Sequence, residues 1–152
     1  MTASGQVRFS TTVFYVGDVA AGVAFYERAF GLEPLRLDEH ENGAYAELRT
    51  GDTKLAFASP ELVDRHLPVP GNEHDPSGPP AGVEIGLTVP EVATAYEGAL
   101  AAGAIPVAPP TAKPWGETVA LIRARTASWS LLQDQPRLSY DHGALRRPDV
   151  VV

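Results

Sequence analysis

The residue in this sequence that is best suited to chemistry is Glu84, a carboxylate within an alternating segment. Residues 82–89 indicate a strand with apolar side chains on one face and three other residues on the opposite face: Glu84, Gly86 and Thr88. A carboxylate on the inner face of a sheet is costly to bury without a partner. Two interpretations therefore stay open. In the first, Glu84 lies at a wet rim or pairs with one of three arginines: Arg8, Arg123 or Arg125. In the second, it receives a cationic or hydrogen-bond-donating ligand, or acts as a base with a raised pKa.

Trp115 is the second residue whose type suggests contact with a ligand. It stands in Lys113-Pro114-Trp115-Gly116, where prolines and a glycine stiffen a loop that would lie over a pocket mouth. An indole there is an apolar surface that ordinary loop composition does not require. The alternative is a loop anchor packed on the edge of the sheet. Trp129 alternates with two serines and is predicted to belong to the core.

Thiol chemistry and histidine metal sites find little support. There is no cysteine, which excludes disulfides, thiol nucleophiles and cysteine metal sites. The four histidines fall in predicted loops, linker or tail: His40, His66, His74 and His142. His74 and Asp75 are adjacent possible ligands, but they lack rigid placement, so a solvated linker is the favoured interpretation.

Length and composition indicate one globular domain. The chain has 152 residues, of which 44% are hydrophobic, enough for a real core. No apolar run approaches the ~20 residues that span a membrane. Residues 1–10 lack the apolar segment of a secretory signal, so a cytoplasmic location is expected. The net charge of −7 argues against binding of nucleic acid, and it suits a cationic ligand without requiring one.

The elements that would position these residues occur twice. A strand at 7–16 leads into a helix that Asp18 can cap and Gly31 can end. Three short strands follow at 33–38, 44–50 and 53–58. In the second copy, strand 82–89 leads into a helix over 90–102, a strand at 105–108 and a hairpin of 117–124 and 128–133. The unit is thus duplicated with a length of roughly 70 residues.

The predicted organisation is a single domain over residues 1–152. It comprises a first βαβββ module at 7–58, a Pro/Gly-rich connector at 59–81, a second module at 82–135 and a tail at 136–152. Within the connector, Ser59 and Pro60 favour a short helix that reaches about His66. The tail has no clear period.

Any internal site should be built from paired positions of the two copies. Superimposing Val16 on Val89 places Thr11 on Glu84. Alternation then puts Thr11, Val13 and Tyr15 on one face of the strand, opposite Thr12, Phe14 and Val16. Tyr45 and Glu47 share one face of strand 44–50, and the sequence leaves open whether that face is the inner one.

The two copies resemble the two halves of the vicinal oxygen chelate (VOC) superfamily. The phrases that carry the resemblance are Phe14 to Val19 followed by Phe25-Tyr26, and Gly82 to Val89 followed by Ala101 to Ala104. This superfamily includes glyoxalase I, extradiol dioxygenases, fosfomycin-resistance transferases and bleomycin-resistance proteins, and the resemblance covers about residues 7–135. It implies an α+β fold in which two tandem βαβββ modules form a curled, barrel-like mixed sheet around a pocket, with helices outside.

The resemblance also implies four positions at which the superfamily's enzymes usually hold a divalent metal. They fall on Thr11, Ala56, Glu84 and Leu132, and only Glu84 is a competent ligand. One carboxylate plus waters does not hold such an ion tightly. Many members carry an Asp-Pro-Asp-Gly-like turn in the last hairpin, where this chain has Arg125-Thr126-Ala127-Ser128. No metal and no other cofactor is expected.

These features predict a metal-independent small-molecule-binding protein of the bleomycin-resistance type. It would sequester a planar organic compound, an antibiotic or a metabolite, and Trp-Gly at 115–116 matches the ring-stacking position of drug-binding members. The expected ligand contacts are Thr11, Val13, Tyr15, Glu84, Gly86, Thr88 and Trp115. The expected partners are a small molecule and a second copy in a homodimer, without nucleic acid or membrane. The alternative is a lyase or isomerase that acts on a small carbonyl substrate with Glu84 as general base. Whether the pocket lies within one chain or between two chains stays open.

Overall fold

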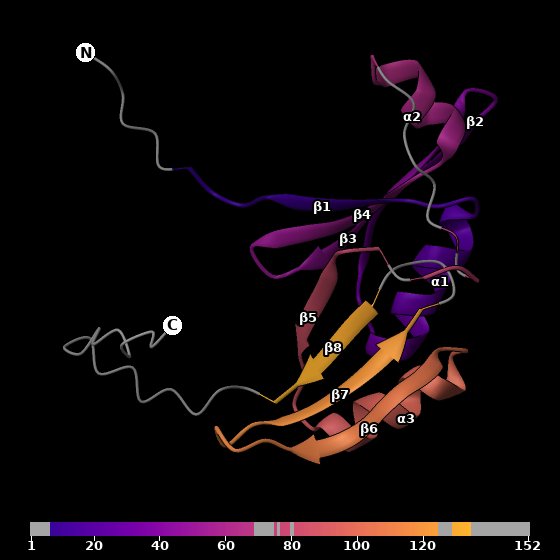
Figure 1. The fold of residues 1–152 in the computed structure, drawn as a ribbon. Coiled ribbons are helices and arrows are strands. Elements are labelled where there is room, and N and C mark those ends of the chain that lie inside the picture. Colours follow the sequence, from indigo (N-terminus) through magenta and orange to yellow (C-terminus); the bar gives the residue numbers. More distant parts are fainter. Residues whose placement is uncertain (1–6, 69–74, 76, 80, 125–128, 135–152) are drawn as a thin grey trace, which may run out of the picture.

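The computed structural model describes residues 7–68, 75, 77–79, 81–124 and 129–134. Two four-stranded sheets, each with its own long helix, make up the fold (Figure 1). The predicted tail at 136–152 and residues 69–74, 76 and 80 of the connector therefore lie outside the described part. No helix in the described ranges is long and apolar enough to cross a membrane.

The first module consists of four strands and one helix in βαβββ order. Its elements are β1 (Thr11–Tyr15), α1 (Val19–Phe30), β2 (Pro34–His40), β3 (Gly43–Thr50) and β4 (Thr53–Ala58). The strand order in the sheet is β1-β4-β3-β2. β1 is parallel to β4, and the other neighbours are antiparallel.

The second module repeats this plan. Its elements are β5 (Glu84–Thr88), α3 (Val92–Ala101), β6 (Ile105–Ala112), β7 (Thr118–Arg123) and β8 (Trp129–Gln133). The order β5-β8-β7-β6 has the same single parallel pair, here β5 with β8. The expected α+β fold of two tandem βαβββ modules is confirmed, with the two sheets separate rather than closed into one barrel.

Local sequence explains where the helices begin and end. The Asp18 carboxylate accepts a hydrogen bond from the Ala21 amide at 2.8 Å at the start of α1. Gly31 ends α1 in the left-handed conformation, with φ of 65°. The helix α3 begins at Val92 rather than at residue 90, because Glu91 is its N-cap and its carboxylate accepts a hydrogen bond from the Ala93 amide.

One predicted loop is a strand in the structure. β6 extends to Ala112 and includes Pro109 and Pro110. The sequence pattern predicts a strand that ends at residue 108 and a loop that contains both prolines. Proline is tolerated because β6 is an edge strand, and irregularities in its register with β7 fall at these residues.

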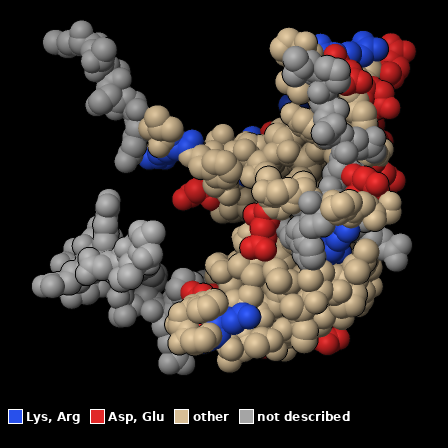
Figure 2. Space-filling view, viewed as in Figure 1, with Lys and Arg blue, Asp and Glu red and all other residues tan. Residues whose placement is uncertain are grey.

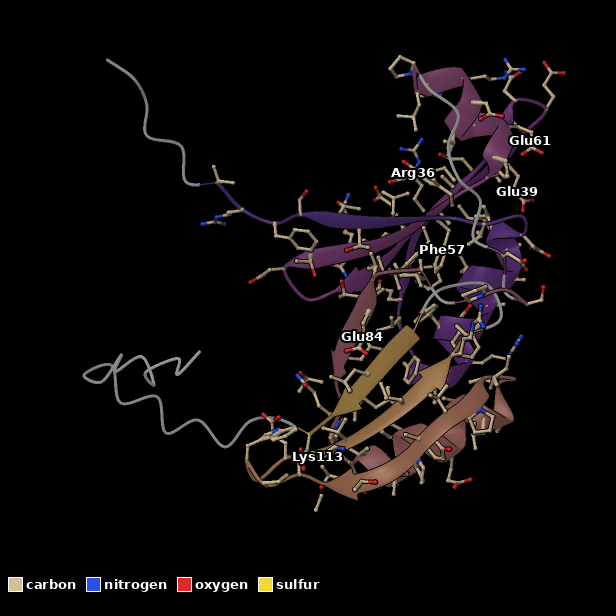
Figure 3. The ribbon with its side chains drawn as sticks, viewed as in Figure 1. Arg36, Glu39, Phe57, Glu61, Glu84 and Lys113 are labelled. Carbon is tan, nitrogen blue, oxygen red and sulfur yellow. The ribbon has the colours of Figure 1, made fainter. Side chains whose placement is uncertain are left out.

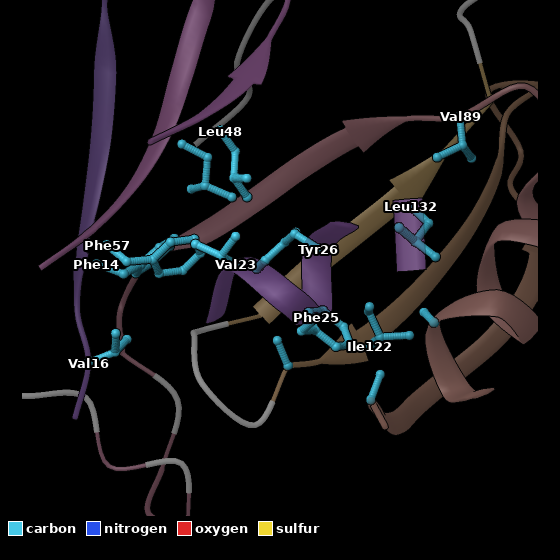
Figure 4. Packing of buried hydrophobic residues seen from close by; sticks show 14 of the residues in the cluster. Phe14, Val16, Val23, Phe25, Tyr26, Leu48, Phe57, Val89, Ile122 and Leu132 are labelled. Atoms are coloured by element: carbon cyan, nitrogen blue, oxygen red, sulfur yellow. The ribbon is translucent and has the colours of Figure 1, made fainter. Parts of the chain in front are cut away.

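A single core joins the two modules. The helices α1 and α3 pack against each other and against their own sheets. Tyr26 and Phe25 of α1 lie between Phe57 of β4 and Ile122 of β7 (Figure 4). This shared core fixes the first sheet relative to the second, and so determines what lies between them.

The face of each sheet opposite its long helix carries the residues predicted for a pocket. Val13 is exposed, whereas Phe14 and Val16 are buried against the helix side, as alternation predicted. The register Val13–Ala56–Glu47 puts Glu47 on the same face as Val13, and Tyr45 follows with Tyr15. Tyr45 and Glu47 therefore lie on the face of the first sheet that is opposite its long helix.

The short helix α2 (Pro60–His66) covers one end of this open face. Its Leu62 and His66 border a cavity of about 220 Å³ together with Tyr15 and Tyr45. The backbone fits closely here, since a Cβ on Gly43 would lie 2.7 Å from the Leu62 nitrogen. The helix predicted from Ser59 and Pro60 is confirmed.

Candidate functional site

A cleft lies between the two modules. Its volume is about 720 Å³, and Figure 2 shows the surface hollowed between the modules. One wall is the strand β5 with the residue before it. The other wall is the tip of the β3–β4 hairpin, residues 49–51 and 53–55, together with Phe9, Thr12 and Leu32.

The strand β5 exposes more than one face to this cleft because it is an edge strand. In the described structure it pairs only with β8, so its other edge is free. Ile85 and Leu87 line the cleft from the helix side of the sheet, whereas Glu84 lines it from the opposite side. A molecule in the cleft would therefore contact both apolar and polar side chains along one strand.

Glu84 projects from β5 as an exposed carboxylate (Figure 3). Its side chain makes no hydrogen bond and no ion pair with any described residue. The expected partner Arg123 instead donates to the Asp75 carbonyl at 3.1 Å. Arg125 lies outside the described residues, and Arg8 has no ion pair to Glu84. The carboxylate is thus available to a ligand.

Two cations line the same cleft, and each already has an acidic partner. The Arg49 Nε lies 2.9 Å from Glu33 Oε2, and the Lys54 Nζ lies 2.9 Å from Glu47 Oε1. Of the charged groups that line the cleft, only Glu84 lacks a partner within the described structure.

Glu47 is the centre of a small polar cluster on the open face of the first sheet. Tyr45 donates its hydroxyl to Glu47 Oε1 at 3.0 Å, and Lys54 donates to the same oxygen. The Lys54 hydrogen bond lowers the pKa of Glu47 below its ordinary value. Burial, followed by the hydrogen bond to Glu47, raises the pKa of Tyr45. The cluster thus holds a stable carboxylate and positions Lys54 at the cleft.

The structure brings some of the predicted ligand contacts together and separates others. Glu84, Gly86 and Thr88 all line the cleft. Thr11, Val13 and Tyr15 lie on the open face of β1, and the β1 residue that lines the cleft is Thr12. Sequence alternation predicted the faces of β1 correctly, but it gave no information on which face the second module would approach.

Trp115 lies away from the cleft. It occupies the turn between β6 and β7, is 66% exposed, and donates its indole N–H to Glu117 Oε2 at 2.8 Å. The turn is closed by the Lys113 amide, which donates to the Glu117 carbonyl at 2.7 Å. The side chain of Trp129 lies outside the described part of the structure, so its predicted place in the core is not described.

Sequence reasoning missed many of the residues that line the cleft, among them Leu32, Arg49, Lys54 and Leu55. These four lie on the loop after α1 and on the β3–β4 hairpin, far from β5 in sequence. Alternation could have placed Lys54 on the face of Ala56, but no signal in the sequence brings the hairpin tip next to the second module.

Of the four positions that the resemblance implies for a metal, Glu84 alone carries a carboxylate or an imidazole. The assignment of Leu132 is wrong: Leu132 pairs with Leu87 and is 0% exposed in the core. The β8 residues on the open face are Leu131 and Gln133, because side chains alternate along the strand. With Thr11, Ala56 and Glu84, the set still contains one carboxylate and no imidazole. No group of three or more His, Cys, Asp or Glu residues converges in the described part of the chain.

Solved structures share this fold over most of their length. A glyoxalase-related enzyme from Fulvimarina pelagi superimposes with a TM-score of 0.72 at 18% identity, covering 85% of this chain and 88% of that one. A glyoxalase/bleomycin resistance protein/dioxygenase from Nocardioides gives a TM-score of 0.64 at 23% identity, covering 90% and 88%. A family enzyme from Burkholderia phytofirmans PsJN gives 0.60 at 18% identity, covering 82% and 96%. At these identities the likeness concerns the fold alone.

Sequence comparison assigns the family. Among curated proteins, none matches the chain. The model of the Glyoxalase/Bleomycin resistance protein/Dioxygenase superfamily matches residues 8–126, which span both modules from before β1 to beyond β7. Because this family model matches most of the chain, the chain belongs to the glyoxalase/bleomycin resistance protein/dioxygenase superfamily.

Proposed function

We propose that this protein binds a planar organic molecule in the cleft between its two modules, without a metal, and that the ligand presents a cationic or hydrogen-bond-donating group to Glu84. The observation that carries the proposal is the unpartnered Glu84 carboxylate in a cleft whose two cations are already paired. Family members bind small molecules, and the net charge of −7 further favours a cation.

Metal independence follows from donor chemistry. A divalent ion needs several carboxylate or imidazole ligands. The open-face positions that correspond to the superfamily's ligands offer Glu84 and, at most, the weak amide donor of Gln133. Binding would therefore rest on charge, hydrogen bonds and apolar contact.

We prefer sequestration of a ligand over catalysis, because a general base such as Glu84 is not sufficient for an enzymatic reaction. A general base needs a second group that stabilises the developing charge. Arg49 and Lys54 line the cleft with Glu84, which favours the alternative of a lyase or isomerase acting on a small carbonyl substrate. Each cation is already paired with an acidic side chain, Glu33 or Glu47, however, which offsets the positive charge that it would offer to a substrate.

A second copy of the chain is the proposed partner. Val13 on the open face is 41% exposed, and the edges of β1 and β5 pair with no other described strand. A two-fold homodimer would cover the open face around Val13 and the edge of β1, leave the edge of β5 to the ligand, and bring Thr11, Val13, Tyr15 and Trp115 near the ligand. Light scattering should give about twice the chain mass of 16.1 kDa. Val13→Asp should yield monomers, while Val107→Asp, on the edge strand β6, should not; a monomeric wild type at micromolar concentration would refute the dimer.

Calorimetric titration with planar aromatic amines tests the binding function. The simplest probe is 4-methylbenzylamine, with wild type, Glu84→Gln and the control Glu39→Gln, an exposed strand glutamate outside the cleft. A charge-assisted hydrogen bond contributes about 1.5–3 kcal/mol, so Glu84→Gln should weaken binding about ten- to a hundred-fold. Equal affinity in all three proteins would contradict the proposal. Retained binding with lost turnover of a carbonyl substrate in Glu84→Gln would identify an enzyme instead.

A further inference from the structure

A second hollow lies on the helix side of the molecule, between α1 and α3. Its volume is about 460 Å³. The residues that border it come from the end of α1, the end of β5 and the first turns of α3. They include Ala29, Phe30, Ala95 and Gly98, which are apolar or lack a side chain. We refer to this hollow as the α1–α3 groove.

The groove adjoins the cleft. Leu32, Leu87 and Thr88 line both cavities. Glu84 lies at the start of β5, and Thr88 lies at its end. A molecule with one end at Glu84 that follows the free edge of β5 therefore reaches the groove at Leu87 and Leu32.

The groove offers no available charge. Its only charged lining residue is Glu91. The Glu91 carboxylate caps α3, accepting from the Ala93 amide at 3.0 Å and the Thr94 amide at 2.6 Å. Hydrogen bonds from Thr94 hold the pKa of Glu91 below its ordinary value, so the group stays ionised and engaged. An apolar chain suits the remaining surface, because it would bury Phe30, Leu87 and Ala95 without leaving a polar group unpaired.

We infer that the ligand is an elongated amphiphilic cation, with its charged group at Glu84 and an apolar chain that runs along β5 into the α1–α3 groove. This inference rests on the proposed binding function and adds the shape and polarity of the ligand. It assigns Leu32 and Leu87 to the passage between the two cavities, and Gly98 to the floor of the groove.

A homologous series of 4-alkylbenzylamines, from methyl to hexyl, measures the reach of the chain. Each buried methylene should improve the dissociation constant about three- to fourfold. In wild type, the affinity should keep increasing through the series as the alkyl chain of the ligand enters the groove. Titration calorimetry gives the affinity and a stoichiometry of one per chain, which separates specific binding from non-specific adsorption.

Gly98→Leu should abolish the increase in affinity that longer alkyl chains give in wild type. An added Cβ at Gly98 would meet only the Ala29 carbonyl oxygen, at an ordinary 3.5 Å, so the larger side chain can extend into the groove. The control Ala101→Leu adds the same side chain to an exposed position of α3 outside the groove. Gly98→Ala, a smaller change that favours the helix, should cancel the gain of about one methylene.

The outcomes separate this inference from the proposed function. If 4-methylbenzylamine binds through Glu84 but affinity does not rise with chain length, the binding function stands and the inference is overturned. A rise of equal slope in wild type and Gly98→Leu overturns it as well, because the chain then lies elsewhere. If chain length matters and Gly98→Leu blocks it while Glu84→Gln binds like wild type, the groove is supported and the proposed role of Glu84 fails. Absence of binding by every member overturns both.

Discussion

Tyr26 and Ser130 connect the two modules through a hydrogen bond inside the shared core. The Tyr26 hydroxyl of α1 lies 3.3 Å from the Ser130 Oγ of β8, and both residues are 0% exposed. A buried polar pair restricts the orientation of the two modules more than apolar contacts do, because each buried hydroxyl would lack a hydrogen-bond partner if the other moved away. The relative placement of the sheets, and hence the cleft, depends on this contact region.

Tyr26→Phe should lower the free energy of unfolding by about 1–3 kcal/mol, because it leaves the Ser130 hydroxyl buried without a partner. The double variant Tyr26→Phe with Ser130→Ala should recover part of that loss, since both polar groups are then gone. Urea unfolding followed by circular dichroism measures all three proteins against wild type. Strictly additive losses would show that the two hydroxyls do not interact.

The same pair predicts a dependence on alkaline pH. Burial raises the pKa of Tyr26 above its ordinary value of 10.0, so the folded state favours the neutral phenol. This contribution to stability is complete below about pH 10 and is lost as pH rises through the higher folded value. Tyr26→Phe should lose less stability than wild type over that range.

Glu47 should contribute to stability at neutral pH and much less in acid. The Lys54 hydrogen bond lowers its pKa below the ordinary 4.5, so its contribution is present above that value and is lost as pH falls through the lower folded value. Glu47→Gln should cost roughly 0.2–1 kcal/mol near neutral pH, as for a partly exposed ion pair. The difference from wild type should shrink in urea unfolding at about pH 3. Glu39→Gln is the control, and a loss that does not change with pH would contradict the assignment.

Much of the fold could be predicted from sequence because its determinants are local. Alternation in residues 11–16 predicted which side chains face the helix, and Asp18 and Gly31 predicted the ends of α1. Prediction was wrong where tertiary context decides. Pro109 and Pro110 lie in a strand because β6 is at an edge, and Leu132 faces the core because the register of β8 with β5 differs by one residue from the expected alignment.

The candidate site could be predicted only in part, for a physical reason. Glu84, Gly86 and Thr88 follow from alternation on one strand. Arg49 and Lys54 join them only because α1 and α3 pack against each other and thereby bring the β3–β4 hairpin to β5. That packing depends on long-range contacts such as Tyr26 with Ser130, which local patterns do not encode.

Gly86 offers a way to block the cleft without disturbing the fold. A Cβ at Gly86 would meet no atom within 4 Å, and its φ is not positive, so a side chain there is unstrained. Gly86→Phe should weaken binding of 4-methylbenzylamine at least about tenfold, a loss of about 1.4 kcal/mol, and change unfolding free energy by less than about 0.5 kcal/mol. Gly82→Phe, also in open space but outside the cleft, should bind normally. Unchanged binding in Gly86→Phe would place the ligand elsewhere.

Metal analysis provides the sharpest test of the metal-independent function. Protein purified without chelator should contain no stoichiometric zinc, nickel, manganese or iron, because Glu84 is the one carboxylate at the superfamily positions. A metal held a thousandfold above its dissociation constant would stabilise the fold by about 4 kcal/mol, which corresponds to roughly 8–16 °C in Tm for a chain of this size. Chelator should therefore leave the Tm of wild type unchanged, and so should Glu84→Ala. One metal per chain by elemental analysis, lost together with such a Tm shift in Glu84→Ala, would overturn the binding function in favour of the lyase or isomerase, because the carboxylate would then be a ligand of a catalytic ion rather than of an organic cation.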